Sequence, residues 1–417
     1  MAPALGSASV RRNAPVQWLA LAGFAAAGPL AIVAPKGLWI AGLLIALARL
    51  VHLLGRGGGW RSGLGDARRL GLLWLLVALG LTSALWTVVP AHSLERGLRL
   101  VLEFGAGALI IGLACTIGRH DARIHLQALA AGLILAAALA IADIELAGYL
   151  LRWSHGQPVA IYAYGPGAAF SALVLLPLAI SLWQHRARLW AVAAAVAAAA
   201  FVLLAANETA KLALPLAVVG GLAAAWRWTR PLPALAFAVP LLAVPLLVPQ
   251  PMDSPFGCWL MEQKLSIVHR LGIWNFVDAA VAERPVLGWG LEASRRIPGG
   301  TMQLAMPDCG PELGPEIYGP RIGERLPLHP HGLSMNLWLE LGAVGVFLLL
   351  VVLLDWARRL YRLPRAYAWA PCAALSAVFL PATASFGMWQ GWWLTTLFLL
   401  AAVCLLRPTA PADAPPR

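Results

Sequence analysis

Long apolar runs recur along this chain and are separated by short polar stretches that often contain arginine. Each run can cross about 30 Å of hydrocarbon as a helix, and none alternates like the strand of a membrane β-barrel. The pattern predicts an all-α, polytopic membrane protein with about 12 transmembrane helices. The expected crossings cover residues 16–34, 38–54, 70–88, 98–117, 125–147, 160–183, 189–206, 212–226, 231–249, 333–354, 368–386 and 389–406.

The composition agrees with a membrane protein, because 60% of the 417 residues are hydrophobic and only 12% are charged. The net charge of +12 could indicate a nucleic-acid partner, but the arginines sit mostly in short loops between apolar runs. There they orient the helices by the positive-inside rule. We therefore expect contact with membrane lipids, no nucleic acid partner, and both chain termini in the cytoplasm.

The polar stretch at residues 250–331 is too long for a simple connector, so we expect it to carry function. It divides the chain into helices 1–9 (residues 1–249), a large outer loop (250–331), helices 10–12 (332–406) and a cytoplasmic tail (407–417). Within the loop, apolar residues from Gln263 to Ala282 recur at helical spacing. This spacing predicts an amphipathic helix on the membrane surface.

The second half of the outer loop, Pro285–Pro330, is dense in proline and glycine, so an ordered loop without helix or strand is expected. Cys258 and Cys309 both lie in the outer loop. If the loop faces an oxidising compartment, a disulfide between them is expected. Neither cysteine belongs to a CxxC or HxxxH pattern, so a zinc site is not expected.

Two histidines, His329 and His331, stand where the polar loop meets the apolar run of the tenth crossing. A histidine titrates near neutral pH and can take a proton from a hydroxyl group. Cations at the mouth of a membrane cavity suit an anionic lipid headgroup. Together these groups predict the displacement of a diphosphate from a lipid carrier by an alcohol. The candidate cations are Arg270, Lys211, Arg96 and Arg99.

Each candidate also has a purely structural interpretation. Lys211 and Arg96 could be topological charges at helix ends, and Arg270 could snorkel from an interfacial helix. His329 could pack within the loop, and Glu340, inside the tenth crossing, could be held by a structural hydrogen bond. The sequence contains no Walker A motif and no outer D-x-D pair, so no cofactor and no metal ion are expected.

Two segments carry a family resemblance. One joins His331-Gly332 to Glu340-Leu-Gly-Ala-Val-Gly345, and the other joins Arg270-Leu-Gly-Ile-Trp274 to Arg284-Pro-Val-Leu-Gly-Trp-Gly-Leu291. Together they resemble the bacterial O-antigen ligase family, whose superfamily also contains the O-antigen polymerases. The resemblance implies a C-type glycosyltransferase-like fold in the bacterial inner membrane, with one large periplasmic loop. It also implies that a glycan moves from undecaprenyl diphosphate to a periplasmic hydroxyl group, without a metal ion and with inversion.

The resemblance assigns the family's critical histidine to His331 and its loop arginine, a diphosphate contact, to Arg270. A second family arginine has no exact counterpart, and Lys211 stands in the equivalent place. Gly332 is a further departure, because Asn, Ser or Gln commonly follows the histidine. His329 or Asn336 could take over the role of that missing side chain.

The leading hypothesis is an O-antigen ligase that joins a polymerised glycan to lipid A-core. The alternative within the superfamily is an O-antigen or exopolysaccharide polymerase, whose acceptor is a second lipid-linked glycan. A transporter of lipid-linked glycans without chemistry is a hypothesis from another class. It is disfavoured because no repeated halves are evident and the acidic residues lie mainly on the outer face.

Overall fold

The computed structural model describes residues 6–55, 59–152, 158–247 and 249–406, and helices dominate it. The fold is all-α apart from two short strands, as the apolar pattern predicts. The helices before the outer segment (residues 250–331) are α1 (Gly6–Val33), η1 (Pro35–Gly37), α2 (Leu38–Leu54), α3 (Gly59–Leu70), α4 (Leu73–Thr82), η2 (Ser83–Leu85), α5 (Pro90–Thr116), α6 (Arg119–Glu145), η3 (Ile161–Tyr164), α8 (Gly165–Gln184), α9 (Arg188–Leu204), α10 (Glu208–Ala223), α11 (Leu232–Leu235), α12 (Ala238–Ala243) and η4 (Val244–Leu246).

The helices after the outer segment lie against this first group. They are α16 (Leu333–Arg362), α17 (Arg365–Ala384) and α18 (Gly391–Leu405). The predicted cytoplasmic tail at residues 407–417 lies outside the described residues.

Within the described residues, seven helical segments are long and apolar enough to cross a membrane. An eighth is present if α3 and the α4–η2 segment are counted as one span bent by 88°. The structure therefore indicates a multi-pass membrane protein. The seven segments are Pro15–Val33, Pro35–Leu54, Pro90–Thr116, Arg119–Glu145, Ile161–Gln184, Leu333–Arg362 and Arg365–Ala384.

The other four expected crossings coincide with shorter helices. α9 has 17 residues, α10 has 16 and α18 has 15. The run at residues 231–249 is divided among α11, α12 and η4, because its prolines interrupt the helical hydrogen bonds. The expected total of twelve crossings stays a prediction.

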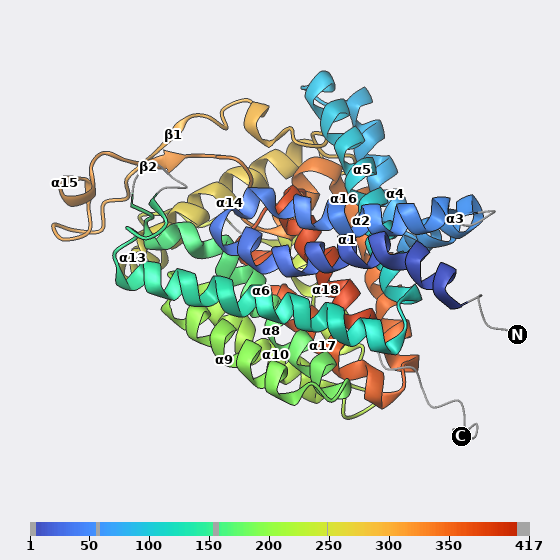
Figure 1. Ribbon diagram of the computed structural model, residues 1–417. Helices are drawn as coiled ribbons and strands as arrows, with labels where there is room; N and C mark the ends of the chain where they lie inside the picture. Colours follow the sequence, from blue (N-terminus) through green and yellow to red (C-terminus); the bar gives the residue numbers. More distant parts are fainter. Residues whose placement is uncertain (1–5, 56–58, 153–157, 248, 407–417) are drawn as a thin grey trace, which may run out of the picture.

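Small residues let neighbouring helices come close together. Gly28 in α1 faces Gly132 in α6, and a Cβ atom added to Gly132 would lie only 2.0 Å from the carbonyl oxygen of Ala25. No side chain fits there, so the two backbones approach each other directly. α1 also packs against α2 and α8, and α10 packs against α17, which gives the bundle seen in Figure 1.

The outer segment contains helices and a small sheet, and its strands lie at the left of Figure 1. β1 pairs antiparallel with β2, with Gln303 opposite Glu324. The expectation of a loop without helix or strand over Pro285–Pro330 is therefore wrong. Gly323 lies within β2 at a φ of +145°. The glycine content of this stretch, on which the loop prediction rested, is therefore compatible with a strand. The elements are α13 (Pro255–Gln263), α14 (Leu265–Glu283), η5 (Ser294–Arg296), β1 (Gln303–Ala305), α15 (Pro315–Tyr318) and β2 (Arg321–Glu324).

The helix α14 forms where the apolar spacing predicts one, but its apolar face packs against protein rather than against a membrane. Ile273 and Val277 are fully buried, in a cluster that includes Trp289 and Leu339. Leu339 belongs to α16, which α14 contacts directly. α14 therefore joins the outer segment to the membrane helices.

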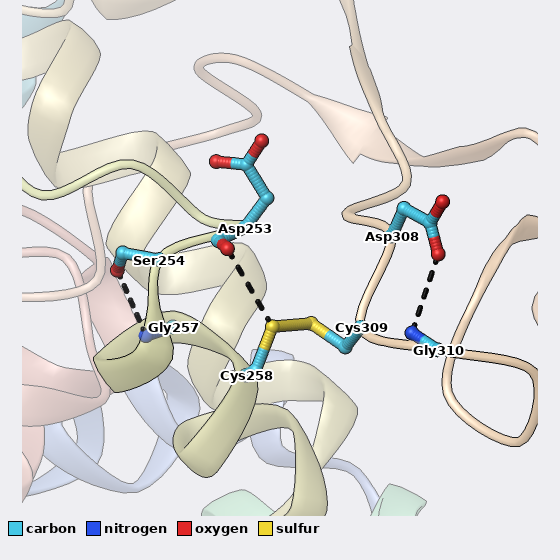
Figure 2. Close-up of a disulfide and its surroundings, with 7 residues drawn as sticks. All are labelled: Asp253, Ser254, Gly257, Cys258, Asp308, Cys309 and Gly310. Carbon is cyan, nitrogen blue, oxygen red and sulfur yellow. Dashed lines mark hydrogen bonds between the residues drawn. A yellow bond between two sulfur atoms is a disulfide. The ribbon is translucent and has the colours of Figure 1, made fainter.

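A disulfide between Cys258 and Cys309 ties α13 to the stretch between β1 and α15, as Figure 2 shows. Ser254 caps α13, since its hydroxyl oxygen accepts a hydrogen bond of 3.1 Å from the backbone N–H of Gly257. The two cysteines are separated by 51 residues of sequence. A cross-link over such a distance removes much of the conformational freedom of the unfolded segment.

We predict that replacing both cysteines, by Cys258→Ser and Cys309→Ser, destabilises the outer segment by about 2–4 kcal/mol, because a large loop is opened. Limited proteolysis of the purified protein should then show faster cleavage within residues 250–331. Cys115→Ser changes an exposed free cysteine, so this matched control should leave the cleavage rate unchanged. A titration of the unreduced, denatured protein that finds all five cysteines reactive would contradict the disulfide.

Candidate functional site

His331 lies immediately before the start of α16, with Gly332 as the N-cap. Its backbone φ of +56° is in the left-handed region, which is rare for a residue with a side chain. Its Nδ1 atom is 3.1 Å from the carbonyl oxygen of Ser385, which follows α17. A carbonyl oxygen only accepts hydrogen bonds, so Nδ1 carries the proton and the neutral ring presents the lone pair of Nε2. The ring can therefore act as a base.

The surroundings keep this base neutral. Burial lowers the pKa of His331, and electrostatic repulsion, chiefly from the Arg270 guanidinium, lowers it further. The hydrogen bond to Ser385 acts in the opposite direction, because the carbonyl oxygen favours the protonated ring. The net effect is a pKa below the ordinary value of 6.5, so most molecules hold an unprotonated His331 at neutral pH.

Arg270 lies in α14, is half-buried and stands close enough to His331 to influence its pKa. Within the described part of the chain, no carboxylate lies within ion-pair distance of this guanidinium group. Burial lowers the pKa of Arg270, but an arginine is so basic that it stays charged at neutral pH. A half-buried cation that lacks a carboxylate partner is suited to an anionic ligand.

The start of α10, which carries Lys211, lies near Ser385, but no contact joins the Lys211 side chain to His331 or Arg270 within the described residues. The Thr209 hydroxyl lies 2.7 Å from the Ser385 hydroxyl, so α10 begins beside the residue whose carbonyl holds His331. Asn207 caps the helix by accepting a hydrogen bond from the N–H of Ala210. The Lys211 ammonium is 3.3 Å from a Glu208 carboxylate oxygen, so its charge is partly compensated.

The structure places Arg96 and Arg99 differently. Arg96 makes two hydrogen bonds to the Glu103 carboxylate, at 3.1 and 2.9 Å, and donates to the carbonyl oxygen of Trp389. Its Nε also lies 3.6 Å from Glu292. Arg99 is largely exposed and pairs with Glu95 one turn earlier in α5. Carboxylates thus compensate both arginines, and Arg96 braces α5 against Trp389, which lies two residues before α18.

The supporting candidates His329, Asn336 and Glu340 line one cavity. The rings of His329 and His331 have centroids 4.5 Å apart, and the backbone N–H of His331 donates to Nδ1 of His329 at 3.2 Å. Asn336 accepts a hydrogen bond of 3.0 Å from the N–H of Met388. Glu340 is buried and accepts from the Ser294 hydroxyl at 3.0 Å and from the Trp389 indole at 2.8 Å.

The two segments that carry the family resemblance are hydrogen-bonded to each other. Gly342 interrupts α16 with φ +59° and ψ −160°, a conformation that is essentially restricted to glycine. The N–H groups of Ala343 and Val344 donate to the carbonyls of Pro285 and Val286, at 2.8 and 3.2 Å. The loop at residues 284–291 therefore supplies hydrogen bonds at the break in the helix.

The same loop also donates hydrogen bonds to the part of α16 that precedes the break. The N–H of Trp289 donates to the backbone carbonyl of Leu339 at 2.8 Å, and the N–H of Gly290 donates to the backbone carbonyl of Glu340 at 2.9 Å. A Cβ atom on Gly288 would lie 2.5 Å from the Glu340 carbonyl carbon, so only glycine fits against α16. These glycines therefore have a structural role, and the Gly-x-Gly pattern is not a nucleotide site.

Sequence reasoning missed Ser83, Ser93 and Ser385. The first two attach the loop to the earlier helices, since Ser83 accepts from the N–H of Leu291 at 2.9 Å and Ser93 donates to its carbonyl at 2.6 Å. Ser385 acts on His331 through a backbone carbonyl, which every residue type possesses. The sequence therefore holds no signal for that contact.

No family model matches the chain. A protein of Rickettsia conorii is 28% identical over 192 residues, which is 43% of this chain and 43% of the relative. A protein of Rickettsia prowazekii is 31% identical over 144 residues, which is 34% of this chain and 33% of the relative. A Rickettsia typhi protein is 30% identical over 149 residues, 35% of this chain and 34% of the relative. All three are named putative polysaccharide ligase, and the chain spans less than half the length of each.

We predict that Gly342→Ala destabilises the protein by about 2–3 kcal/mol, because alanine is strained at this φ and ψ. The added Cβ would also lie 2.4 Å from the carbonyl oxygen of Val286. Thermal unfolding of the detergent-purified protein should show the loss as a lower melting temperature. Gly105→Ala is the matched control, because Gly105 lies in α5 with open space around it. Equal melting temperatures for the two variants would contradict a role for the break.

Proposed function

We propose that this protein is an O-antigen ligase-like glycosyltransferase, which moves a glycan from undecaprenyl diphosphate to a hydroxyl group of lipid A-core. The observation that carries the proposal is the pairing of a neutral His331, held through Nδ1 by Ser385, with Arg270, which has no carboxylate partner in the described residues. The resemblance to O-antigen ligases and the similarity to proteins named as polysaccharide ligases support it.

In the proposed reaction, Nε2 of His331 takes the proton from the acceptor hydroxyl, and that oxygen attacks the anomeric carbon of the donor sugar. The bond between this carbon and the diphosphate oxygen breaks at the same time. The electron pair leaves with undecaprenyl diphosphate, whose growing negative charge Arg270 and Lys211 stabilise. Attack from the face opposite the leaving group inverts the anomeric carbon. Neither a metal ion nor a cofactor takes part.

The proposed topology places the active site on the periplasmic face of the bacterial inner membrane. The seven long apolar helices support a multi-pass protein, and the shorter helices would supply the remaining crossings of a twelve-helix arrangement. Both termini then lie in the cytoplasm, where the arginine-rich short loops belong. The outer segment at residues 250–331, with its disulfide, then lies in an oxidising compartment.

Reconstitution with purified protein tests the function directly. We predict glycan transfer from an undecaprenyl-diphosphate-linked donor to rough lipopolysaccharide, and transfer that persists in EDTA. His331→Ala should lose about 100-fold to 10,000-fold in rate, the usual contribution of a general base. His120→Ala is the matched control, because His120 is an exposed histidine at the start of α6.

Either of two outcomes would contradict this proposal. One is wild-type activity in His331→Ala, and the other is loss of wild-type activity in EDTA. Transfer only to a second lipid-linked glycan would replace the ligase by the polymerase alternative. Movement of a donor analogue across the bilayer without any bond formation would instead indicate a transporter.

The proposed base must be neutral, so we predict that kcat/KM rises with pH through the pKa of His331 and then levels off. Burial and the charge of Arg270 lower this pKa, so the midpoint should fall below 6.5. Arg270→Gln removes a positive neighbour and should move the midpoint to higher pH, whereas Arg270→Lys should not. The pH profile would contradict the arrangement if its midpoint were the same in Arg270→Gln and in wild type.

A further inference from the structure

A small cavity lies next to the proposed base, and neither Arg270 nor Lys211 lines it, although Arg96 pairs with Glu292 of its wall. Its volume is about 100 Å³, well above the roughly 15 Å³ that a single water molecule needs. His329 forms part of its wall, and the His329 ring lies against that of His331. The residues that line it are Glu292, Leu328, His329, Asn336, Glu340, Gly387, Trp389 and Gln390.

Two lining side chains carry polar atoms that lack partners. Asn336 is only 2% exposed, and its Nδ2 donates no hydrogen bond within the described part of the chain. Its Oδ1 is engaged by the N–H of Met388, which fixes the orientation of the amide. The Oε1 of Gln390 likewise accepts no hydrogen bond there. Buried polar atoms are nearly always paired, so an unused donor and an unused acceptor in one wall point to a ligand.

The polar groups of the cavity indicate which ligand it suits. Glu292 and Glu340 both line it; Glu340 is held in place by hydrogen bonds from Ser294 and Trp389, and Glu292 lies 3.6 Å from the Arg96 guanidinium. The polar atoms left unpaired there belong to the uncharged amides of Asn336 and Gln390. A diphosphate is better served by the guanidinium of Arg270, which has no carboxylate partner in the described residues. Carboxylate, amide donor and amide acceptor together match a group that both donates and accepts, such as a sugar hydroxyl.

We propose that this cavity binds the hydroxyl-bearing edge of an uncharged sugar on the acceptor. The proposal rests on the proposed function, because it assigns to that reaction the side of His331 from which the acceptor approaches. The amide of Asn336 donates to one sugar hydroxyl, and Gln390 and Glu292 accept from its neighbours. A further hydroxyl of the same sugar then lies toward His331.

Steady-state kinetics on the full-length protein can test this assignment. Asn336→Asp keeps the oxygen that accepts from Met388 and removes the unpaired donor, but it adds an ionisable group, so the variant Glu292→Gln is tested beside it. With saturating donor, the KM of Asn336→Asp for the acceptor should rise about tenfold, the loss of one good hydrogen bond, while its KM for the donor stays within about twofold. The acceptor is rough lipopolysaccharide in one arm and a second lipid-linked glycan in the other, which identifies the source of the sugar.

Glu292→Gln should behave in the same way, whereas the matched control Glu312→Gln should not, since Glu312 is exposed in the outer segment. Arg270→Gln should raise the KM for the donor instead. The assignment is overturned if both cavity variants keep the wild-type KM for the acceptor. It is also overturned if they raise both KM values equally.

A binding measurement separates the failure of this inference from the failure of the proposed function. If wild-type protein transfers glycan to neither acceptor, the proposed function fails, and the cavity is then tested without turnover. Saturation-transfer NMR with core oligosaccharide released from lipid A should give signals with wild type that Asn336→Asp loses. Equal signals from the two proteins, or none from wild type, would overturn the sugar site.

Discussion

The arrangement around the start of α16 depends on one constraint, which is that backbone polar groups in apolar surroundings must find partners. A break in a helix leaves N–H and C=O groups exposed, and each unpaired group would cost several kcal/mol in hydrocarbon. At Gly342 the loop at residues 284–291 provides those partners on both sides of the break. The first turns of α16 and the outer segment therefore form one unit, and His331 and Glu340 both belong to it.

This unit brings different binding groups close to the histidine pair. Arg270, from the outer segment, lies near His331, and Glu292 and Glu340 line the cavity beside His329. Arg96 pairs with Glu103 and Glu292, so its charge is compensated whereas that of Arg270 is not compensated within the described residues. Arg270 would therefore suit an anionic leaving group, and the unpaired amide atoms of Asn336 and Gln390 would suit an uncharged sugar.

Much of this could be predicted from the sequence, because long apolar runs and titratable residues at their ends are local signals. The apolar runs form helices, and the residues with helical apolar spacing at Gln263–Ala282 lie largely in α14. The predictions that were wrong depended on tertiary contacts. The apolar face of α14 packs on α16 rather than on a membrane, and part of the Pro- and Gly-rich stretch pairs as strands. Arg96 carries the same charge as Arg270, and only the fold reveals the carboxylates that surround it.

The contact between Thr209 and Ser385 links the position of α10 to the orientation of the His331 ring. α10 has 16 residues and is about 24 Å long, which is shorter than the hydrocarbon layer of about 30 Å. If α10 crosses the membrane as proposed, the surrounding lipid must thin, or the helix must shift along its axis. Any such shift acts on Ser385 through a hydroxyl contact of 2.7 Å, and Ser385 holds the ring of His331. A mismatch between the length of α10 and the thickness of the bilayer would therefore act on the His331 imidazole. Lipids of different chain length would change the orientation of the ring.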